Sequence, residues 1–275
     1  MSLTSFLKDN ADVRERFRQE FKKPEFLAKK ELVAPPLTTR STTVGTAFDY
    51  LLRFFIQHLN PHTIDKGYWV AETAVERLAN DAKLYAKGKK IISRARKNLA
   101  SFQKKGQMSD ALIESALLLA TLDPIVRAGR GHETIGVVHK DDVQDLKNLI
   151  SAVDKNIFTA KNLCMINPNF GSASVLVGGA DADLVVDDTI IDIKTTKKLT
   201  LERSYLDQVL GYYVLHQISG VGELNPKPTI TKVAIYFSRF GYLYVVPLPK
   251  LVDSATFPKF VRWFQKRAAE SFPSE

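Results

Sequence analysis

The sequence contains a single cysteine, Cys164, among its 275 residues. One cysteine excludes an intramolecular disulfide and any metal site built only from cysteines. No run of eighteen apolar residues occurs, so we expect no transmembrane helix. The N-terminal segment also lacks the apolar core of a secretory signal peptide. We therefore expect no membrane partner and a cytoplasmic location, which is the host-cell cytoplasm if the chain is phage-encoded.

Acidic residues are scarce in one part of the chain. Lysine and arginine together number 39 against 30 acidic residues, which gives a net charge of +9, and no acid lies between Lys83 and Gln107. Such a run can follow a phosphate backbone, although a solvated helix face is the ordinary explanation. The candidate DNA contacts are Lys89, Lys90, Arg94, Lys97, Lys197 and Lys198.

Apolar residues make up 45% of the chain, enough for a hydrophobic core, and their spacing predicts regular structure. Alternating apolar runs predict strands at 232–237 and 241–246, joined as a hairpin. Helical spacing predicts helices at 11–21, 42–59, 68–85, 89–103, 109–122, 141–152, 201–218 and 257–272.

The central segment contains two short β-branched runs, 184–186 and 189–193, on either side of Asp187 and Asp188. This pattern predicts a strand, a tight turn and a second strand. Side chains alternate between the two faces of a strand. We therefore expect acidic side chains near both strands to gather on shared faces of the sheet.

Two acids and a lysine could meet at one point of this sheet. Asp181 and Asp183 would share a face of the first strand, and Asp192 and Lys194 a face of the second. Clustered carboxylates repel one another, and burial adds a desolvation cost. A hard divalent cation relieves both costs, with the backbone carbonyl of Ile193 as a further ligand. Lys194 would lie beside the metal-bound water, where it can orient the nucleophile or stabilise phosphate charge.

Three motifs follow one another in this part of the chain. They are Gly178-Gly179-Ala180-Asp181, Asp192-Ile193-Lys194-Thr195 and Gln208-Val209-Leu210-Gly211-Tyr212. Together they resemble the Gly-x-x-Asp, Asp-x-Lys-Thr and Gln-x-x-x-Tyr motifs of the PD-(D/E)XK nuclease superfamily, in its RecB-type exonuclease branch. The match covers roughly residues 172–250, and Ala180 stands where the superfamily name has proline.

The resemblance implies an α/β fold with a restriction-endonuclease-like core, in which a mixed sheet is flanked by helices. It divides the chain into an N-terminal helical extension (1–40), a helical region with the first-motif helix and the basic insertion (41–170), and the nuclease core (171–275). The expected order in the core is a helix, a three-strand meander, a helix and a strand.

The implied activity is hydrolysis of DNA phosphodiester bonds with Mg²⁺ or Mn²⁺. Asp181 and Asp192 would hold the metal, Lys194 would orient the water, and Gln208 and Tyr212 would position phosphate or brace the site. The glycine spacing favours Asp181 as the ligand and leaves Asp183 in reserve. Some RecB-type nucleases carry a four-cysteine iron–sulfur cluster, which this chain cannot form.

The first motif of the family places a metal-binding histidine four residues after a glycine. Here Gly45 is followed by Asp49, and aspartate can bind Mg²⁺ or Mn²⁺ directly. The alternative is an exposed helix aspartate. Glu72 and Glu76, four residues apart on one predicted helix face, are further metal or acid candidates, with surface helix acids as the ordinary interpretation.

Two other functions remain open at this stage. The chain could be a non-catalytic DNA-binding relative of the nucleases, or an unrelated α/β interaction protein in which the three motifs coincide by chance. No Walker loop or helicase motif occurs, so a helicase or recombination partner would be a separate chain. The sequence leaves open the strand preference, exonuclease against endonuclease action, and a role in repair, recombination, defence or phage DNA processing.

Overall fold

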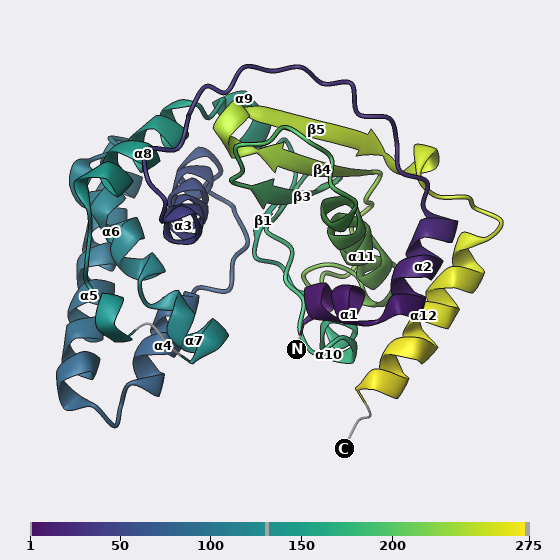
Figure 1. Cartoon of the computed structure of the whole chain (residues 1–275), viewed down its shortest axis with the longest axis horizontal. Coiled ribbons are helices and arrows are strands. Elements are labelled where there is room, and N and C mark those ends of the chain that lie inside the picture. Colours follow the sequence, from purple (N-terminus) through teal and green to yellow (C-terminus); the bar gives the residue numbers. More distant parts are fainter. Residues whose placement is uncertain (1, 130–131, 273–275) are drawn as a thin grey trace.

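The computed structural model describes residues 2–129 and 132–272 and has an α/β architecture. Its centre is a mixed five-stranded sheet in the order β1-β2-β3-β4-β5, flanked by helices (Figure 1). The strands are β1 (Cys164–Ile166), β2 (Leu184–Val186), β3 (Thr189–Lys194), β4 (Lys232–Phe237) and β5 (Tyr242–Pro247).

The first three strands form the predicted antiparallel meander. β1 pairs with β2 and β2 with β3 in antiparallel register, whereas β4 runs parallel to β3 and antiparallel to β5. The parallel pair needs a crossover, which helix α11 (Arg203–Ser219) supplies. The predicted hairpins at 184–193 and 232–246 are therefore confirmed, as is the order of helix, meander, helix and strand.

The sheet separates two hydrophobic clusters. Leu184 and Ile191 belong to one cluster with the helices between residues 41 and 158, the helical half. Val185 and Ile190 belong to the other with α11 and the terminal helices, the sheet half (residues 2–21 and 163–272). Neighbouring residues along each strand thus serve opposite faces, as the alternation of a strand requires.

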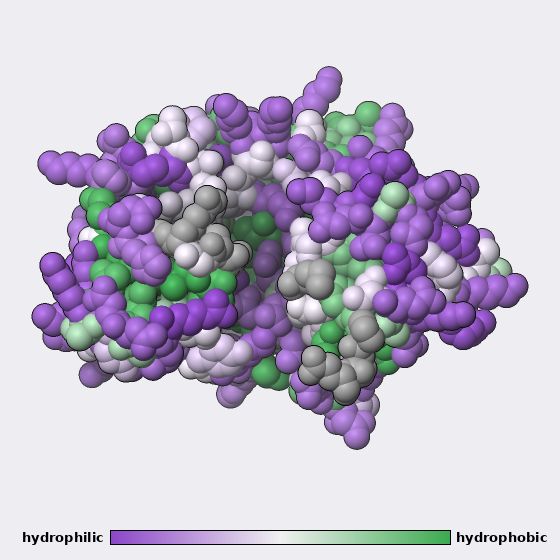
Figure 2. All heavy atoms as spheres, turned by 60° about the horizontal axis from the view of Figure 1, so that its bottom comes forward, coloured by the Kyte–Doolittle hydropathy of each residue, from purple (hydrophilic) through white to green (hydrophobic). Residues whose placement is uncertain are grey.

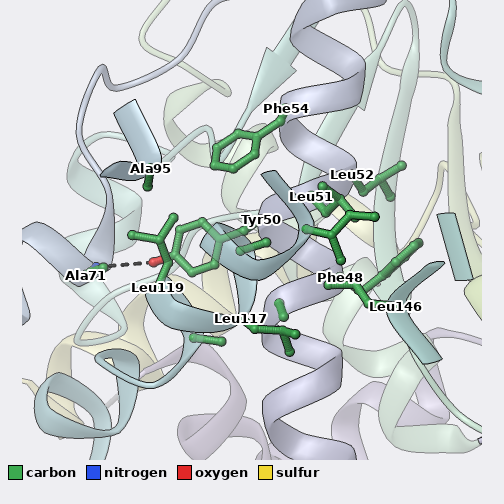
Figure 3. Close-up of a cluster of buried hydrophobic side chains, with 14 of the residues drawn as sticks. Phe48, Tyr50, Leu51, Leu52, Phe54, Ala71, Ala95, Leu117, Leu119 and Leu146 are labelled. Atoms are coloured by element: carbon green, nitrogen blue, oxygen red, sulfur yellow. Dashed lines mark hydrogen bonds between the residues drawn. The ribbon is translucent and has the colours of Figure 1, made fainter. Parts of the chain in front are cut away.

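The helical half is built on α3, which spans Ser41–Leu59 as predicted. Phe48, Leu51 and Leu52 on its apolar face gather with side chains of neighbouring helices, among them Leu117 and Leu146 (Figure 3). The other elements are α4 (Val70–Arg77), α5 (Ala82–Lys105), α6 (Asp110–Ala120), α7 (Asp123–Ala128), a 3-10 turn (His132–Thr134), α8 (Lys140–Ser151) and α9 (Lys155–Phe158).

The predicted helix at 68–85 is wrong, because the chain breaks between α4 and α5. The Asp81 side chain accepts hydrogen bonds from the backbone N–H groups of Lys83 (3.0 Å) and Leu84 (2.9 Å). This cap satisfies donors that have no partner at a helix start. A new helix therefore begins at Ala82 and contains the whole basic run.

The sheet half brings the two ends of the described chain together. Helices α1 (Leu3–Asp9) and α2 (Ala11–Glu20) pack beside α12 (Phe257–Ser271), with Phe17 contacting Phe260 at 5.2 Å between ring centroids. The remaining elements are α10 (Ser172–Leu176) and the 3-10 turns Ser238–Phe240 and Leu248–Lys250. The predicted helices at 11–21 and 257–272 are confirmed, whereas α1 was not predicted.

An extended segment, the strap (residues 22–40), joins α2 to α3 across the molecule (Figure 1). Its middle is fixed by Arg239 in the turn between β4 and β5. The backbone N–H of Ala34 donates to the carbonyl of Arg239 at 3.0 Å, and the Arg239 guanidinium donates to the carbonyl of Ala34 at 2.9 Å. The same guanidinium pairs with Asp145 of α8 at 2.7 Å, so one side chain ties the sheet, the strap and the helical half together.

Within residues 2–129 and 132–272, none of the helices combines the length and apolar character needed to cross a membrane.

The buried histidine of α11 predicts a pH-dependent stability. Burial, and then the charge of Lys227, lower the pKa of His216 to about 4 from an ordinary 6.5. Between these values the unfolded chain binds the proton and the folded chain does not, so stability falls as pH falls. We expect the stability of the wild-type protein relative to His216→Gln to drop by about 2 kcal/mol between pH 7 and pH 4.5.

Urea denaturation at the two pH values measures this difference. His62→Gln, at an exposed histidine, is the control. If the free energy of unfolding differs between the wild type and His216→Gln by the same amount at both pH values, His216 does not contribute to acid sensitivity.

Candidate active site

A cleft of about 360 Å³ opens where α3, the start of β2 and α11 approach one another. Figure 2 shows a hollow between two masses of the molecule on one face. The cleft draws polar side chains from separate elements, among them Asp49, Tyr50, Arg53, Asp123, Asn167, Asp181, Asp183, Gln208 and Tyr212.

Asp192 is fully buried on β3, next to this cleft. Its Oδ2 lies 2.8 Å from Nζ of Lys194, and among the described residues its Oδ1 has no hydrogen-bond partner. Burial raises the pKa of Asp192 to about 7; the Lys194 charge opposes that rise and Asp183 adds to it. A buried carboxylate oxygen without a partner is costly, so the position is poised for a cation or a proton.

Lys194 shares the face of Asp192, as the two-residue spacing predicts. Burial lowers the pKa of Lys194, but Asp192 and then Asp183 outweigh it and leave that pKa above its ordinary value. Nζ also donates to Oε1 of Gln208 at 2.9 Å, and Nε2 of Gln208 donates to the Tyr212 hydroxyl at 2.9 Å. A charged ammonium is therefore held in place by a chain of hydrogen bonds that begins on α11.

Asp183 interacts with the buried pair more closely than Asp181 does. Oδ2 of Asp183 accepts a hydrogen bond from the backbone N–H of Ile193 at 2.7 Å, which fixes it against β3. Asp183 raises the pKa of both Asp192 and Asp49. The structure therefore assigns the reserve candidate, Asp183, the more central position.

Asp181 lies on the rim of the same cleft. Half of its side chain is exposed (50%), and its Oδ1 pairs with Nζ of Lys66 at 2.6 Å. Its backbone forms an isolated bridge with Asn169, and β2 begins only at Leu184. The prediction that Asp181 and Asp183 lie on the first strand is therefore wrong, because both precede it.

Asp49 on α3 faces the cleft from the opposite side. Burial raises the pKa of Asp49 to about 6; Arg53, its ion-pair partner one helical turn later, lowers it and Asp183 raises it. Oδ1 of Asp49 has no hydrogen-bond partner among the described residues. α3 thus places Asp49 near Asp183 and Asp192, and Asp49 is not an exposed helix aspartate.

Glu72 and Glu76, the alternative acid candidates, bond to partners outside the cleft. Glu72 accepts from the backbone N–H of Trp69 at 2.8 Å and pairs with Arg96 at 2.9 Å. Glu76 pairs with Lys89 at 2.9 Å. Neither lines the cleft, so Asp49 is the better candidate for the acid of the first motif.

The oxygen donors around Asp192 are of the type that a hard divalent cation prefers, but among the described residues they do not form a complete ligand group. No group of three or more His, Cys, Asp or Glu side chains is arranged to share an ion in the part of the chain that the structure describes. The oxygens Oδ1 of Asp49 and Oδ1 of Asp192 are nevertheless buried without hydrogen bonds, and Ile193 lines an opening shared with Asp49 and Asp183. Carboxylate and carbonyl oxygens are the ligands that Mg²⁺ prefers.

Sequence reasoning missed three residues of the cleft. The Tyr50 hydroxyl donates to Oδ1 of Asp123 at 2.8 Å and accepts from the backbone N–H of Ala71 at 3.2 Å, the bond drawn in Figure 3. Asp123 is buried and adds to the rise in the pKa of Asp49. Tyr50 and Arg53 could have been found from their positions beside Asp49 on α3. In the sequence, Asp123 precedes a proline and indicates only where a helix ends.

Acids of neighbouring helices neutralise part of the positive charge of α5. Lys89 pairs with Glu76 at 2.9 Å and Arg94 with Glu114 at 2.6 Å, because α4 and α6 supply the acids that the run itself lacks. Lys90 and Lys97 are exposed on the same helix. Lys197 and Lys198 are exposed directly after β3, close in sequence to Lys194.

Separate elements therefore converge on one site. α3 supplies Asp49, the β2–β3 region supplies Asp183, Asp192 and Lys194, and α11 supplies Gln208 and Tyr212. No protein-family model matches the chain, and no match was found among curated proteins or solved structures. The functional interpretation therefore depends on the geometry of this site.

Proposed function

We propose that the chain is a metal-dependent nuclease that hydrolyses DNA phosphodiester bonds, with a restriction-endonuclease-like core similar to the RecB-type branch. The observation that carries the proposal is the buried pair of Asp192 and Lys194 beside Asp49 and Asp183. The order α3, β1–β3, α11, β4 supports it, because the resembled family has the same order.

The acids would hold the metal. Asp192, with either Asp49 or Asp183 and the carbonyl of Ile193, would bind Mg²⁺ or Mn²⁺, and Asp181 lies on the rim, within the same cleft. When bound, such an ion polarises the phosphate and lowers the pKa of a bound water. Before an ion binds, Arg53 offsets the charge of Asp49 and Lys194 offsets the charge of Asp192.

Lys194 would act on the transition state. Its ammonium orients the attacking water and stabilises the charge that develops on phosphate as the new P–O bond forms and the bond to the leaving oxygen breaks. Gln208 holds Nζ through its Oε1, and Tyr212 in turn holds Gln208. Gln208 and Tyr212 are therefore positioning residues for Lys194.

Catalysis explains the cleft better than the two rival functions. A protein that only bound DNA would gain nothing from clustered acids, because they repel phosphate. An interaction protein would have no use for buried carboxylate oxygens without hydrogen bonds, which cost stability. The proposed partner is DNA, reached in part through Lys90, Lys97 and the lysines at 197–198, with any helicase or recombination partner on a separate chain.

The relative importance of the two neighbouring acids tests the site. Asp183→Asn should lower cleavage at least a hundredfold, because it removes a charged group from the centre of the site. Asp181→Asn should lower it less than tenfold, because Asp181 is exposed and paired with Lys66. Both rates are measured with end-labelled linear DNA and with circular DNA in Mg²⁺, Mn²⁺ or EDTA.

The wild-type protein should cleave only with a divalent ion, and the linear and circular substrates separate exonuclease from endonuclease action. Equal rates with and without EDTA would contradict the metal assignment. No cleavage of any substrate by the wild type would contradict the nuclease proposal. A larger loss in Asp181→Asn than in Asp183→Asn would return the ligand role to Asp181.

A further inference from the structure

An aromatic pocket adjoins the proposed active site. It lies between the end of α3, the loop before α4 and the middle of α5. Tyr50, Arg53 and Asn167 line both this pocket and the active-site cleft, so the two lie side by side. The aromatic pocket is further lined by Phe54, Gln57, Asp65, Lys66, Gly67, Tyr68, Trp69, Arg96, Leu99 and Ile166.

Trp69 is fixed in this pocket before any ligand arrives. Its ring lies 5.4 Å from that of Phe54, and the Arg96 guanidinium carbon lies 4.0 Å from its centroid. Arg96 is itself held by Glu72 at 2.9 Å and by the carbonyl of Gly67 at 3.0 Å. Trp69 therefore gives its wall of the pocket a fixed shape, and a preorganised wall lowers the entropic cost of binding beside it.

Tyr68, next to Trp69, exposes 57% of its surface. An aromatic ring in water forgoes the stabilisation that burial gives, and such rings are common where a ligand covers them. Tyr68 therefore offers apolar ring surface among the residues that line a pocket beside the cleft.

Three cations line the pocket, and each is paired with an acid outside the lining. Arg53, Lys66 and Arg96 line the pocket, and Asp65, the acid of its lining, is hydrogen-bonded to Gln57. Lys66 reaches to the active-site rim, where Nζ pairs with Asp181 at 2.6 Å. Cations beside the exposed ring of Tyr68 match a ligand that carries both phosphate and flat bases.

We propose that the aromatic pocket binds an unpaired base of single-stranded DNA while the backbone runs past Lys66 to the active site. The assignment rests on the proposed nuclease function and narrows its substrate. Bases stack on aromatic side chains with little regard to sequence, and arginine adds a cation–π contribution. In an intact duplex each base is stacked and paired, so only a single strand or a frayed end supplies a base to Tyr68.

Equilibrium binding in EDTA tests the pocket without cleavage. Tyr68→Ala should bind a labelled oligothymidylate about five- to a hundredfold more weakly than the wild type, the loss of one base stack. Both proteins should bind an abasic oligonucleotide of equal length alike, because it keeps the phosphates and lacks the bases. Tyr242→Ala, at a partly exposed tyrosine of β5 outside the pocket, should bind both ligands as the wild type does.

Tryptophan fluorescence gives a second readout. The chain has two tryptophans, so Trp263→Phe leaves Trp69 as the single reporter. Oligothymidylate should quench this emission, and the abasic oligonucleotide should leave it unchanged.

The two proposals fail in different ways. The base-binding proposal is wrong if Tyr68→Ala binds oligothymidylate as tightly as the wild type does. It is also wrong if the wild type binds the abasic strand as tightly as oligothymidylate. Either result holds even if the protein cleaves DNA. If binding depends on the bases and Tyr68→Ala abolishes that dependence, the base-binding proposal is supported even when no substrate is cleaved. The absence of cleavage would contradict only the nuclease proposal.

Discussion

Lys194→Met is expected to lower single-turnover cleavage by roughly a hundred- to a thousandfold while DNA binding stays close to that of the wild type. Methionine keeps most of the side-chain volume beside Asp192 but removes the ammonium. The charge acts mainly as the reaction proceeds, when phosphate gains negative charge, so ground-state affinity changes little. Lys194→Arg should restore little, because the planar guanidinium cannot take the place of a compact ammonium.

Lys66→Met is the matched control. Lys66 also pairs with an acid of the cleft, at 2.6 Å from Asp181, but it lies on the rim. Its loss should change single-turnover cleavage at saturating protein less than tenfold. Melting temperature, DNA affinity and cleavage are measured on the same set of proteins. If Lys194→Met cleaves normally and only melts earlier, Lys194 is a structural partner of Asp192 and the proposed mechanism loses its central group.

Arg239→Met should reduce the free energy of unfolding by about 3–5 kcal/mol, the cost of leaving one member of a buried ion pair alone. Arg239 is 2% exposed and Asp145 is fully buried. Asp145 also accepts from the backbone N–H of Leu37 at 3.2 Å, so the change leaves a buried charge and loosens the strap together. For a domain whose total stability is about 5–15 kcal/mol, this is a large fraction.

Urea denaturation measures the loss, with Arg267→Met as the control. Arg267 pairs with Asp12 at 2.6 Å on the surface, where an ion pair contributes roughly 1 kcal/mol or less. The double variant Arg239→Met with Asp145→Leu should regain part of the stability, because no unpaired charge remains. Equal losses in Arg239→Met and Arg267→Met would contradict the role of the buried pair.

Elements with a strong internal period were predictable from the sequence. α3, α12 and the two hairpins have apolar positions whose spacing sets both type and bounds within a residue or two. α1 has seven residues, too few for a clear period, and depends on a reciprocal cap between Ser2 and Ser5. The break at Asp81 was missed because a single side-chain cap, rather than any change in hydrophobic spacing, produces it.

The site was predictable where its residues are neighbours in sequence. Asp192 and Lys194 share a strand, and Gln208 and Tyr212 share a helix, so local periodicity places each pair. The spacing from the glycines favoured Asp181 over Asp183. In the structure the backbone N–H of Ile193 instead holds Asp183 against β3, a contact across the hairpin that no local pattern indicates. The partners of Lys89 and Arg94 lie on other helices, where no local pattern shows them.

The packing of α1 and α2 against α12 has a consequence for the order in which the protein folds as it is synthesised. Asp12 meets Arg267, and Phe17 meets Phe260, across almost the whole chain. The helices of the helical half pack mainly on one another and occupy one continuous stretch of sequence, so they can form while the ribosome is still translating the rest. The first two helices, by contrast, must wait for α11 and then α12 to emerge, so during translation their apolar faces need protection by a chaperone or by provisional contacts.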